Sequence, residues 1–376
     1  MTDSSKKDQL YQLIRANPFI SQQELADELG LSRSAVAGHI AGLIRERRLL
    51  GRAYVLPDKR PLLCIGAANL DRKLRSIAAM QLGTSNPATA EEVYGGVARN
   101  IAENLARLGL PVALLTAVGD DGAGRNLQDH AEAIGIDTRG SLKLPDAATG
   151  TYTAILDDQG ELVLALADMA LYDRITSAFL ASRQPQRSAA AMTVADLNLP
   201  ADSITALLES ARTDNVPLVI VAVSQAKMAR LPADLGGLRL LILNRGELET
   251  RAGRALPTEA DVRAACNAVR AQGAQDVIVT CGSQGVYHTR GGELVWLAAH
   301  QAAVMDVTGA GDAFSAAVCW SLYQGNDDLT LACRRGLKAA TLTLESHETV
   351  SPLLSAAALD EIHDFDQSVP LFPSKG

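Results

Sequence analysis

The residues best suited to chemistry stand in one string, Asp306-Val307-Thr308-Gly309-Ala310-Gly311-Asp312-Ala313-Phe314. An apolar helical pattern follows it, so the amides of Gly309, Ala310 and Gly311 would offer unused N–H groups at a helix N-terminus. Such an anion hole stabilises the charge that develops on a phosphoryl group in transfer. Asp312, at the same helix start, could orient an alcohol and accept its proton. The alternative is that these residues form an ordinary turn. The length of this nine-residue string and the helix that follows it argue against that alternative.

Polar residues in two further segments are of the kind that hold a polyol. Asn69 and Asp71 follow an apolar run, and a carboxylate there can accept hydrogen bonds from two neighbouring hydroxyls. Gly95 and Gly96 permit close approach of the backbone, and the amide of Asn100 can both donate and accept. A plain strand-to-helix turn is the alternative interpretation of the two glycines.

Asn244 and Glu247 stand three residues apart and carry hard oxygen atoms suited to Mg²⁺, either directly or through water. The same spacing also suits a helix N-cap with a capping glutamate, so both interpretations stay open.

The elements that must position these residues alternate between apolar runs and helical patterns. The runs cover residues 62–66, 112–119, 192–196, 218–223, 240–244 and 277–281. This alternation predicts an α/β fold in which a mostly parallel sheet is flanked by helices and binds its ligands at the carboxyl ends of the strands. Short β patterns at 74–94 and 149–166 predict a small β-sheet that projects as a lid.

The string at 306–314 resembles the second signature of the ribokinase-like (PfkB) family of carbohydrate and nucleoside kinases. Residues 95–109 are similar to the first signature of that family, and the resemblance spans about 62–355. It implies a ribokinase-like fold, ATP as phosphate donor, and Mg²⁺ organised by Asn244 and Glu247. Lid sheets in this family often pair across a dimer, which implies a homodimer.

The resemblance also implies where the nucleotide and a second cation would bind. The nucleotide contacts would come from Thr280, Gly282, Gly285 and Thr308. Many relatives use a monovalent cation near the signature loop, so Asp306 and Thr308 become candidates for a K⁺ site.

Within the family the residues are most similar to pseudouridine kinases, which implies that pseudouridine is phosphorylated on its 5′-hydroxyl. Arg99 belongs to this resemblance, which makes it a candidate contact to the substrate. Asn198 suits a uracil edge, and Lys227 could reach the base or the phosphate region. Two departures are Ala98 in the first signature and Ala222-Val223, where the subfamily has Asp-Pro. Another nucleoside or sugar, such as inosine, ribose or a keto-sugar, is the alternative substrate.

Residues 1–57 are predicted to form a separate domain, with the kinase-like domain at 58–376. Residues 1–60, which we call the head, carry ten Lys/Arg and seven Asp/Glu. The remainder of the chain carries 25 Lys/Arg and 36 Asp/Glu, so only the head is suited to binding a polyanion. Two short helices around Gly30, followed by a β-hairpin pattern at 49–56, resemble a winged helix-turn-helix domain. The expected contacts to double-stranded DNA are Arg33, Ser34, His39, Arg45 and Arg52, with Arg47 and Arg48 as further phosphate contacts.

The alternatives for the head are a small helical module for protein contacts or, for the whole chain, a transcription regulator whose kinase-like domain only senses a ligand. Apolar residues make up 47% of the chain, with no run long enough to span a bilayer. The five scattered cysteines are typical of a reduced, cytoplasmic protein and give no zinc motif.

Overall fold

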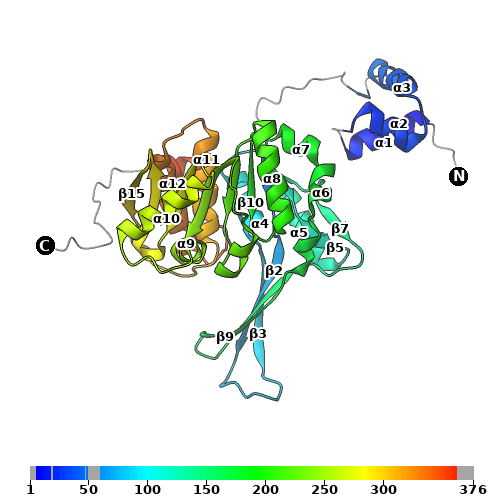
Figure 1. Ribbon diagram of the computed structural model, residues 1–376. Coiled ribbons are helices and arrows are strands. Elements are labelled where there is room, and N and C mark those ends of the chain that lie inside the picture. Colours follow the sequence, from blue (N-terminus) through cyan, green and yellow to red (C-terminus); the bar gives the residue numbers. More distant parts are fainter. Residues whose placement is uncertain (1–5, 18–19, 47, 50–59, 362–376) are drawn as a thin grey trace. The chain divides into compact units, whose positions relative to one another are not determined.

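The computed structural model of this chain describes residues 6–17, 20–46, 48–49 and 60–361. The chain divides into two compact units between Arg60 and Pro61 (Figure 1). The domain boundary predicted at residues 57–58 falls outside the described residues.

The N-terminal unit contains three helices, α1 (Lys6–Ala16), α2 (Gln22–Leu29) and α3 (Arg33–Arg45). The hydroxyl of Ser21 accepts from the N–H of Glu24, whose carboxylate accepts from the N–H of Ser21, so a capping box begins α2. Gly30 follows α2 in the left-handed region, with a φ of 63°. Buried apolar side chains from all three helices form the core of this unit: Leu10, Leu25, Ala26, Val36, Ile40 and Leu43. The predicted wing lies almost wholly outside the described residues.

The second unit is built on a nine-stranded sheet with the order β15-β14-β13-β12-β11-β10-β1-β4-β6. Its strands are β1 (Leu62–Ile65), β4 (Val112–Leu115), β6 (Ile136–Asp137), β10 (Met192–Asp196), β11 (Leu218–Val221), β12 (Leu238–Asn244), β13 (Asp276–Thr280), β14 (Gly285–Arg290) and β15 (Glu293–Ala298). The strands from β13 to β6 pair in parallel, whereas β14 and β15 are antiparallel. The predicted mostly parallel sheet is therefore confirmed.

Helices cover both faces of this sheet (Figure 1). They are α4 (Val97–Arg107), α5 (Gly122–Ala133), α6 (Ser177–Ser182), α7 (Gln184–Ala189), α8 (Ala201–Asp214), α9 (Arg245–Ala252), α10 (Glu259–Ala271), α11 (Ala310–Tyr323), α12 (Leu329–Leu344) and α13 (Ala356–Asp360). Short 3₁₀ turns are η1 (Ala170–Arg174), η2 (Gln225–Arg230) and η3 (Gly282–Gln284). Within the described residues no helix is long and apolar enough to cross a bilayer.

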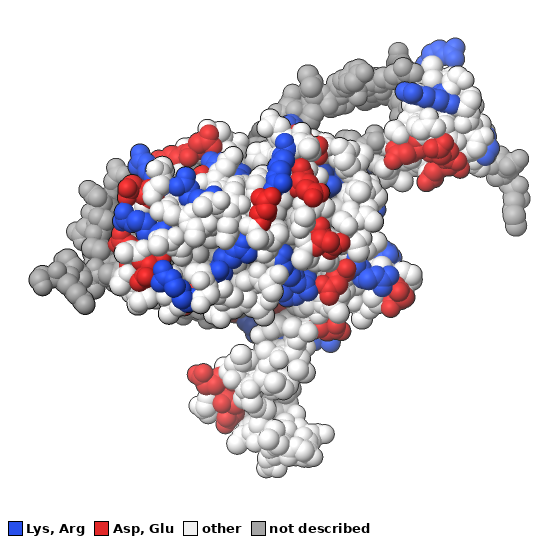
Figure 2. All heavy atoms as spheres, viewed as in Figure 1, with Lys and Arg blue, Asp and Glu red and all other residues white. Residues whose placement is uncertain are grey.

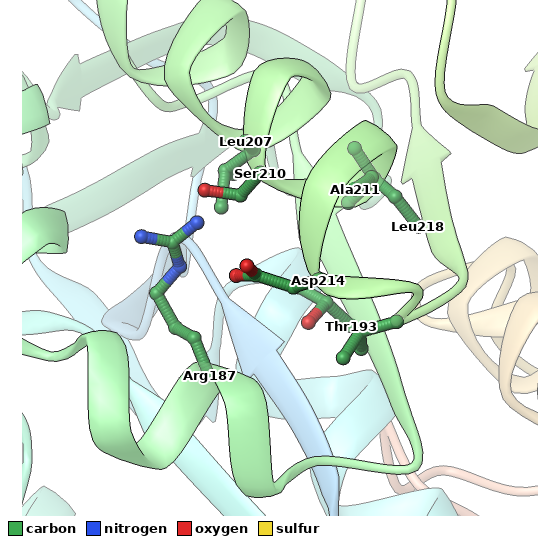
Figure 3. Close-up of a pocket in the computed structure, with 8 residues that line it drawn as sticks. Arg187, Thr193, Leu207, Ser210, Ala211, Asp214 and Leu218 are labelled. Atoms are coloured by element: carbon green, nitrogen blue, oxygen red, sulfur yellow. The ribbon is translucent and has the colours of Figure 1, made fainter.

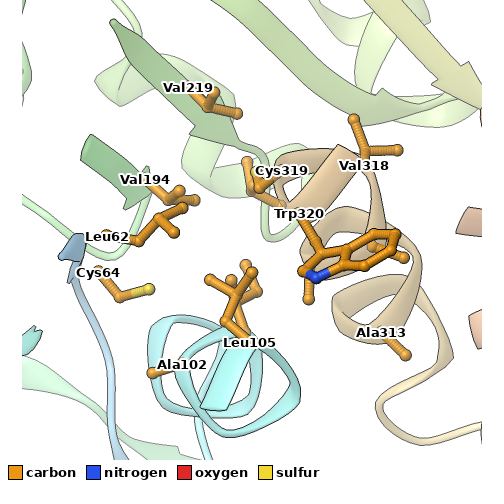
Figure 4. Close-up of a cluster of buried hydrophobic side chains, with 14 of the residues drawn as sticks. Leu62, Cys64, Ala102, Leu105, Val194, Val219, Ala313, Val318, Cys319 and Trp320 are labelled. Atoms are coloured by element: carbon orange, nitrogen blue, oxygen red, sulfur yellow. The ribbon is translucent and has the colours of Figure 1, made fainter. Parts of the chain in front are cut away.

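The core lies in two layers because successive side chains of a strand point to opposite faces. Leu62 and Cys64 of β1 pack into the layer that contains α4, α11 and α12. Leu63 and Ile65 pack into the opposite layer, which contains α8, α9 and α10. Figure 4 shows the first layer, with Trp320 of α11 among strand and helix side chains. This packing fixes the N-terminal ends of α4 and α11 relative to the sheet.

The predicted lid is a four-stranded sheet of order β3-β2-β8-β9 that projects from the body (Figure 1). Its strands are β2 (Asn69–Ser76), β3 (Ala88–Gly95), β8 (Thr151–Leu156) and β9 (Leu162–Asp168), and we call this sheet the lid. A further two-stranded sheet pairs β5 (Ala117–Gly119) with β7 (Leu142–Leu144). The lid begins at Asn69, so the residues that open β2 belong both to the lid and to the edge of the body.

Candidate active site

Asp312 lies in the first turn of α11, directly after the loop of residues 306–309, which we call the glycine loop. Asn100 lies in the first turn of α4, and its Nδ2 donates to Oδ2 of Asp312 over 2.8 Å. Two segments 212 residues apart in sequence therefore meet here. Asp312 as a residue is partly exposed, at the N-terminal end of α11.

Gly309 has a φ of 82°, a left-handed conformation that favours glycine. A Cβ at this position would lie closer than 3.0 Å to the carbonyl oxygen of Thr349. A Cβ on Gly311 would instead meet no atom within 4 Å. The loop is thus packed on one side and open on the other, where the N–H groups of the first helical turn are available to an anion.

Asp71 lies beside this loop on the strand β2. Nδ2 of Asn69 donates to its Oδ1, and Gly95 on β3 leaves no room for a side chain because a Cβ there would clash with the same carboxylate. A Cβ on Gly96 would lie 2.5 Å from the carbonyl oxygen of Ala67. The two glycines let β2, β3 and the end of β1 converge beside Asp71.

The carboxylates at this point influence one another. The pKa of Asp312 is raised to about 7, chiefly by burial and also by the charges of Asp196 and Asp71, while the hydrogen bond from Asn100 and the charge of Arg99 oppose the rise. Burial likewise raises the pKa of Asp71 to about 6. A carboxylate with a pKa near 7 is substantially ionised at neutral pH and also binds a proton readily, which is what a general base requires.

We expect the rate to follow the ionisation of Asp312. Because a base acts when it is deprotonated, kcat/KM for the alcohol should fall by about tenfold per pH unit below a pKa near 7 and level off above it. The measurement is kcat/KM between pH 5.5 and 9 at saturating ATP. A profile that is flat across neutral pH, or that falls as the pH rises, would contradict the role of Asp312 as base.

Asp196 is a functional residue whose role the sequence analysis missed. It is buried at the end of β10, and its carboxylate accepts from the N–H groups of Ala67 (2.9 Å), Ala98 (3.0 Å) and Asn198 (2.8 Å). Burial raises its pKa, and these hydrogen bonds oppose the rise. Asp196 therefore ties the end of β1, the start of α4 and the end of β10 together. The sequence signal that could have identified Asp196 is its position as an acidic residue at the end of a buried apolar strand.

Arg99 was predicted to contact the substrate, and the structure shows it buried among protein partners. It is 4% exposed, its guanidinium donates to the carbonyl of Tyr94 (2.9 Å) and to Oδ1 of Asn100 (2.8 Å), and it forms an ion pair with Glu103. Its bond to the oxygen of Asn100 leaves the nitrogen of that amide facing Asp312. The contact between Arg99 and the substrate stays a prediction.

Asn198 and Lys227 follow β10 and β11 at the same edge of the sheet. Asn198 is 6% exposed, and its backbone carbonyl accepts a hydrogen bond from Nη1 of Arg230 over 2.6 Å. Lys227 lies in η2 and is partly buried; burial and the charge of Arg230 lower its pKa, whereas Asp173 and Asp196 raise it. The structure thus places both side chains on the Asp196 side of the site.

Asn244 and Glu247 form a capping box at the start of α9. Oδ1 of Asn244 accepts from the N–H of Glu247 over 2.9 Å, and Oε2 of Glu247 accepts from the N–H of Asn244 over 2.7 Å. The helix-cap alternative is therefore the geometry observed. In the described part of the chain no three His, Cys, Asp or Glu side chains cluster as metal ligands.

The residues expected around the nucleotide lie next to this cap. Thr280 is the register partner of Asn244 at the carboxyl ends of β13 and β12. Gly282 opens η3, and Gly285 opens β14, where a Cβ would clash with the carbonyl of Leu297. Asn244, Thr280 and the two glycines thus lie together at the carboxyl ends of β12 and β13.

Asp306 and Thr308 were predicted as K⁺ ligands, and the structure gives the carboxylate other partners. Its Oδ1 accepts from the N–H (2.8 Å) and the hydroxyl (2.7 Å) of Thr308, and its Oδ2 forms an ion pair with Lys73 from the lid. Sequence analysis did not single out Lys73, because no local pattern links β2 to a residue 233 positions away.

Most of the predicted DNA contacts lie on or near the surface of α3. Arg33, Ser34 and Arg45 are exposed and His39 is partly exposed, whereas Arg52 lies outside the described residues. Arg48 differs from expectation, because its guanidinium forms an ion pair with Asp8 at 2.8 Å and stacks over the ring of Tyr11. It therefore braces the unit internally.

Two cavities lie away from these residues. One of about 20 Å³ is surrounded by Arg187 and residues of α8 such as Ser210 and Asp214 (Figure 3), and it has room for a single water molecule. The other, of about 350 Å³, is lined in part by His288 and Asp328. Neither contains a predicted site residue.

Comparison with known proteins agrees with this site. Residues 59–356 match the model of the pfkB family carbohydrate kinases, and residues 7–46 match a winged helix-turn-helix DNA-binding model. The chain belongs to the pfkB family: it is a sugar or nucleoside kinase, and its chemistry is phosphotransfer. An N-terminal winged helix-turn-helix domain precedes the kinase domain.

Several known proteins are similar to most of this chain. An uncharacterized sugar kinase, YeiI of Escherichia coli, is 32% identical over 94% of this chain and 97% of its own length. The pseudouridine kinase of the same organism is 35% identical over 73% of this chain and 92% of its own length. A carbohydrate kinase structure from Agrobacterium tumefaciens is 34% identical with a TM-score of 0.70, covering 80% of this chain and 96% of that one.

Proposed function

We propose that this kinase transfers the γ-phosphoryl group of ATP to the 5′-hydroxyl of a nucleoside, with pseudouridine as the first candidate. The observation that carries the proposal is the Asn100–Asp312 hydrogen bond at the open side of the glycine loop. Asp71 lies beside it on a strand that leads into the lid, in a position suited to ribose hydroxyls. One relative is itself named as a pseudouridine kinase.

The transfer can be followed at Asp312. Its carboxylate accepts the proton of the attacking hydroxyl while a bond forms from that oxygen to the γ-phosphorus and the bond to the bridging oxygen of ADP breaks. The negative charge on the equatorial oxygens is met by the amides of Gly309, Ala310 and Gly311. Asn100 holds the carboxylate in place, and Arg99 holds Asn100.

The nucleotide would lie along the edge formed by Asn244, Thr280, Gly282 and Gly285. Mg²⁺ bound with ATP would neutralise charge on its phosphates. One oxygen each of Asn244 and Glu247 already accepts a backbone N–H, so these side chains suit a metal held through water molecules better than direct ligation. Thr308 belongs to the glycine loop and would stand near the phosphates.

Asn198 and Lys227 support a nucleoside over a simple sugar. They lie on the Asp196 side of the site, where the amide of Asn198 can pair with the edge of a base and Lys227 adds a cation close to it. Inosine, ribose and a keto-sugar remain the competing acceptors. The structure of Arabidopsis thaliana ribokinase complexed with ribose and ATP is 20% identical to this chain, so the likeness shows the fold alone.

A panel of acceptors tests the substrate. Pseudouridine, uridine, inosine, ribose and fructose are each incubated with ATP, and release of ADP is measured. The proposal predicts that kcat/KM for pseudouridine exceeds that for ribose by at least about tenfold, because one good hydrogen-bonded contact to the base supplies such a ratio. Equal values for pseudouridine and ribose would contradict the choice of nucleoside.

We also propose that the N-terminal unit binds double-stranded DNA, so that the kinase has a regulatory role in the cytoplasm, where it meets both ATP and DNA. The exposed Arg33, Ser34 and Arg45 lie on α3, which is the helix that enters the major groove in a helix-turn-helix. A regulator that only senses a ligand is the alternative. The hydrogen bond that Asn100 donates to Asp312 at the N-terminus of α11 favours a working kinase.

Arg33→Ala should weaken binding to a duplex from the region upstream of this chain's gene. If Arg33 meets the DNA, the slope of log K against log salt should lose about one unit. Arg15→Ala, an equal change of charge on the exposed side of α1, serves as the matched control. Absence of gel retardation at low salt, with and without nucleoside, would favour a protein-contact module instead.

Finally, we propose that the lid pairs with the lid of a second copy. β9 is an edge strand whose apolar side chains Leu162, Val163, Leu164 and Leu166 are about half exposed, and the face of the lid visible in Figure 2 is mostly free of charged side chains apart from a group of acidic ones. Exposed apolar strands of this kind call for a partner. Light scattering should give the mass of a dimer, and Leu164→Lys should give a monomer; a wild-type monomer would refute the pairing.

A further inference from the structure

We propose that Lys73 of the lid is a built-in counter-ion of the glycine loop, which it holds in place through Asp306 where the family resemblance suggested a monovalent cation. Lys73 is then a positioning residue, and turnover needs no added K⁺. This inference rests on the role proposed above for the glycine loop in phosphotransfer. It concerns Lys73 and Asp306 and is independent of which alcohol is phosphorylated.

The first observation is that protein donors already surround the Asp306 carboxylate. Oδ1 accepts both the N–H and the hydroxyl of Thr308, and Oδ2 is paired with Lys73. The Lys73 side chain is 31% exposed and the Asp306 side chain 21%, so the pair is partly shielded from water and stronger than a surface ion pair. A monovalent cation would have to share this carboxylate with an ammonium group, and the two cations repel each other.

The second observation is the placement of Lys73 on β2. Side chains two residues apart share a face of a strand, so Asn69, Asp71 and Lys73 point the same way. The charge of Lys73 also acts on Asp71, where it opposes the rise in pKa caused by burial. Lys73 therefore stands between the substrate carboxylate and the glycine loop.

Neighbouring lid cations are engaged elsewhere. Arg72 points to the opposite face of β2 and forms an ion pair with Glu92 at 2.7 Å. Arg75 donates to the carbonyl of Asp158 over 2.8 Å. These contacts stay within the lid, whereas the contact of Lys73 joins the lid to the body.

The third observation is how little packing holds the chain before Gly309. Val304, Met305 and Val307 are 59%, 53% and 71% exposed. With little apolar burial to hold it, this segment depends on polar ties: the N–H of Met305 bonds to the carbonyl of Leu344 over 2.8 Å, and Asp306 bonds to Lys73. Removing the ammonium should therefore loosen the loop that positions the phosphoryl group.

The test compares salts and variants of the full chain with the best acceptor from the panel above. Turnover is measured in KCl, NaCl and tetramethylammonium chloride at equal ionic strength. We expect wild-type kcat to stay within about twofold across the three salts.

The Lys73→Met variant should lose about tenfold or more in kcat in tetramethylammonium chloride and regain part of it in KCl. The Lys73→Arg variant should keep most of the wild-type rate. Arg72→Met, one residue away on the other face, should behave as wild type.

A second readout does not depend on turnover. Without substrate, the melting temperature of the wild type should be equal in KCl and tetramethylammonium chloride, and that of Lys73→Met should be higher in KCl. A wild type that needs K⁺ for activity, or a Lys73→Met variant indistinguishable from Arg72→Met, would overturn the inference. If Lys73→Met does not fold, Lys73→Arg and the wild-type salt comparison decide. Failure of every acceptor in the panel would instead defeat the proposed function, and the melting comparison would still test Lys73.

Discussion

Replacing Asp312 by Asn should lower kcat by about 10³-fold while KM for the nucleoside changes only a few-fold. The amide keeps the size and can still pair with Asn100, but it cannot accept the proton of the alcohol. The pKa near 7 that burial gives this carboxylate would be lost, and the rise of the rate through neutral pH should disappear with it. Steady-state kinetics give kcat and KM, and calorimetric titration with nucleoside checks binding.

The matched control for this substitution is Asp202→Asn. Asp202 occupies the first turn of α8, is exposed, and accepts a hydrogen bond from the hydroxyl of Ser177. It presents the same chemical change at a similar helical position without the site around it. Wild-type turnover in Asp312→Asn, or an equal loss in the control, would remove Asp312 from the reaction.

Gly309→Ala should reduce kcat by about 10²-fold or more, because the Cβ would displace the loop whose amides meet the phosphoryl group. The clash is with the carbonyl oxygen of Thr349, a backbone atom that cannot swing aside. Circular dichroism should show a folded protein, and kinetics at saturating ATP should show the loss in kcat.

Gly325→Ala separates the clash from the strain of the conformation. Gly325 follows the other end of α11, with a φ of 79° close to the 82° of Gly309, and a Cβ there meets no atom within 4 Å. Both variants carry the cost of alanine in the left-handed region, about 1 kcal/mol. If both lose activity equally, the packing of the loop against Thr349 is irrelevant to catalysis.

The sequence predicted the parts of the site that short segments encode. Gly309 and Asp312 lie in one turn, so their relation follows from the string itself, and the parallel sheet follows from apolar runs that alternate with helices. The capping box of Asn244 and Glu247 was also foreseen, as the alternative to direct metal ligation, because its spacing is local.

Contacts between residues far apart in the chain could not be predicted from the sequence. The pairing of Lys73 with Asp306 depends on how far β2 carries the lid over the loop, and no periodicity encodes that distance. The burial of Arg99 was not predicted, for a similar reason. Its ion pair with Glu103, one helical turn away, lies in the interior only because the fold covers that side of α4. Asp196 acts through three backbone N–H groups from separate segments, which only the fold brings together.

If Asp312 acts as the base, the alcohol held beside it receives the terminal phosphoryl group of ATP. Incubating the protein with pseudouridine and ATP labelled in the γ-phosphate, and locating the label by phosphorus NMR, decides whether it does. We expect a labelled 5′-phosphomonoester with the wild-type protein and almost none with Asp312→Asn. Label that appears only in inorganic phosphate, or in a nucleoside phosphate formed equally by both proteins, would contradict it.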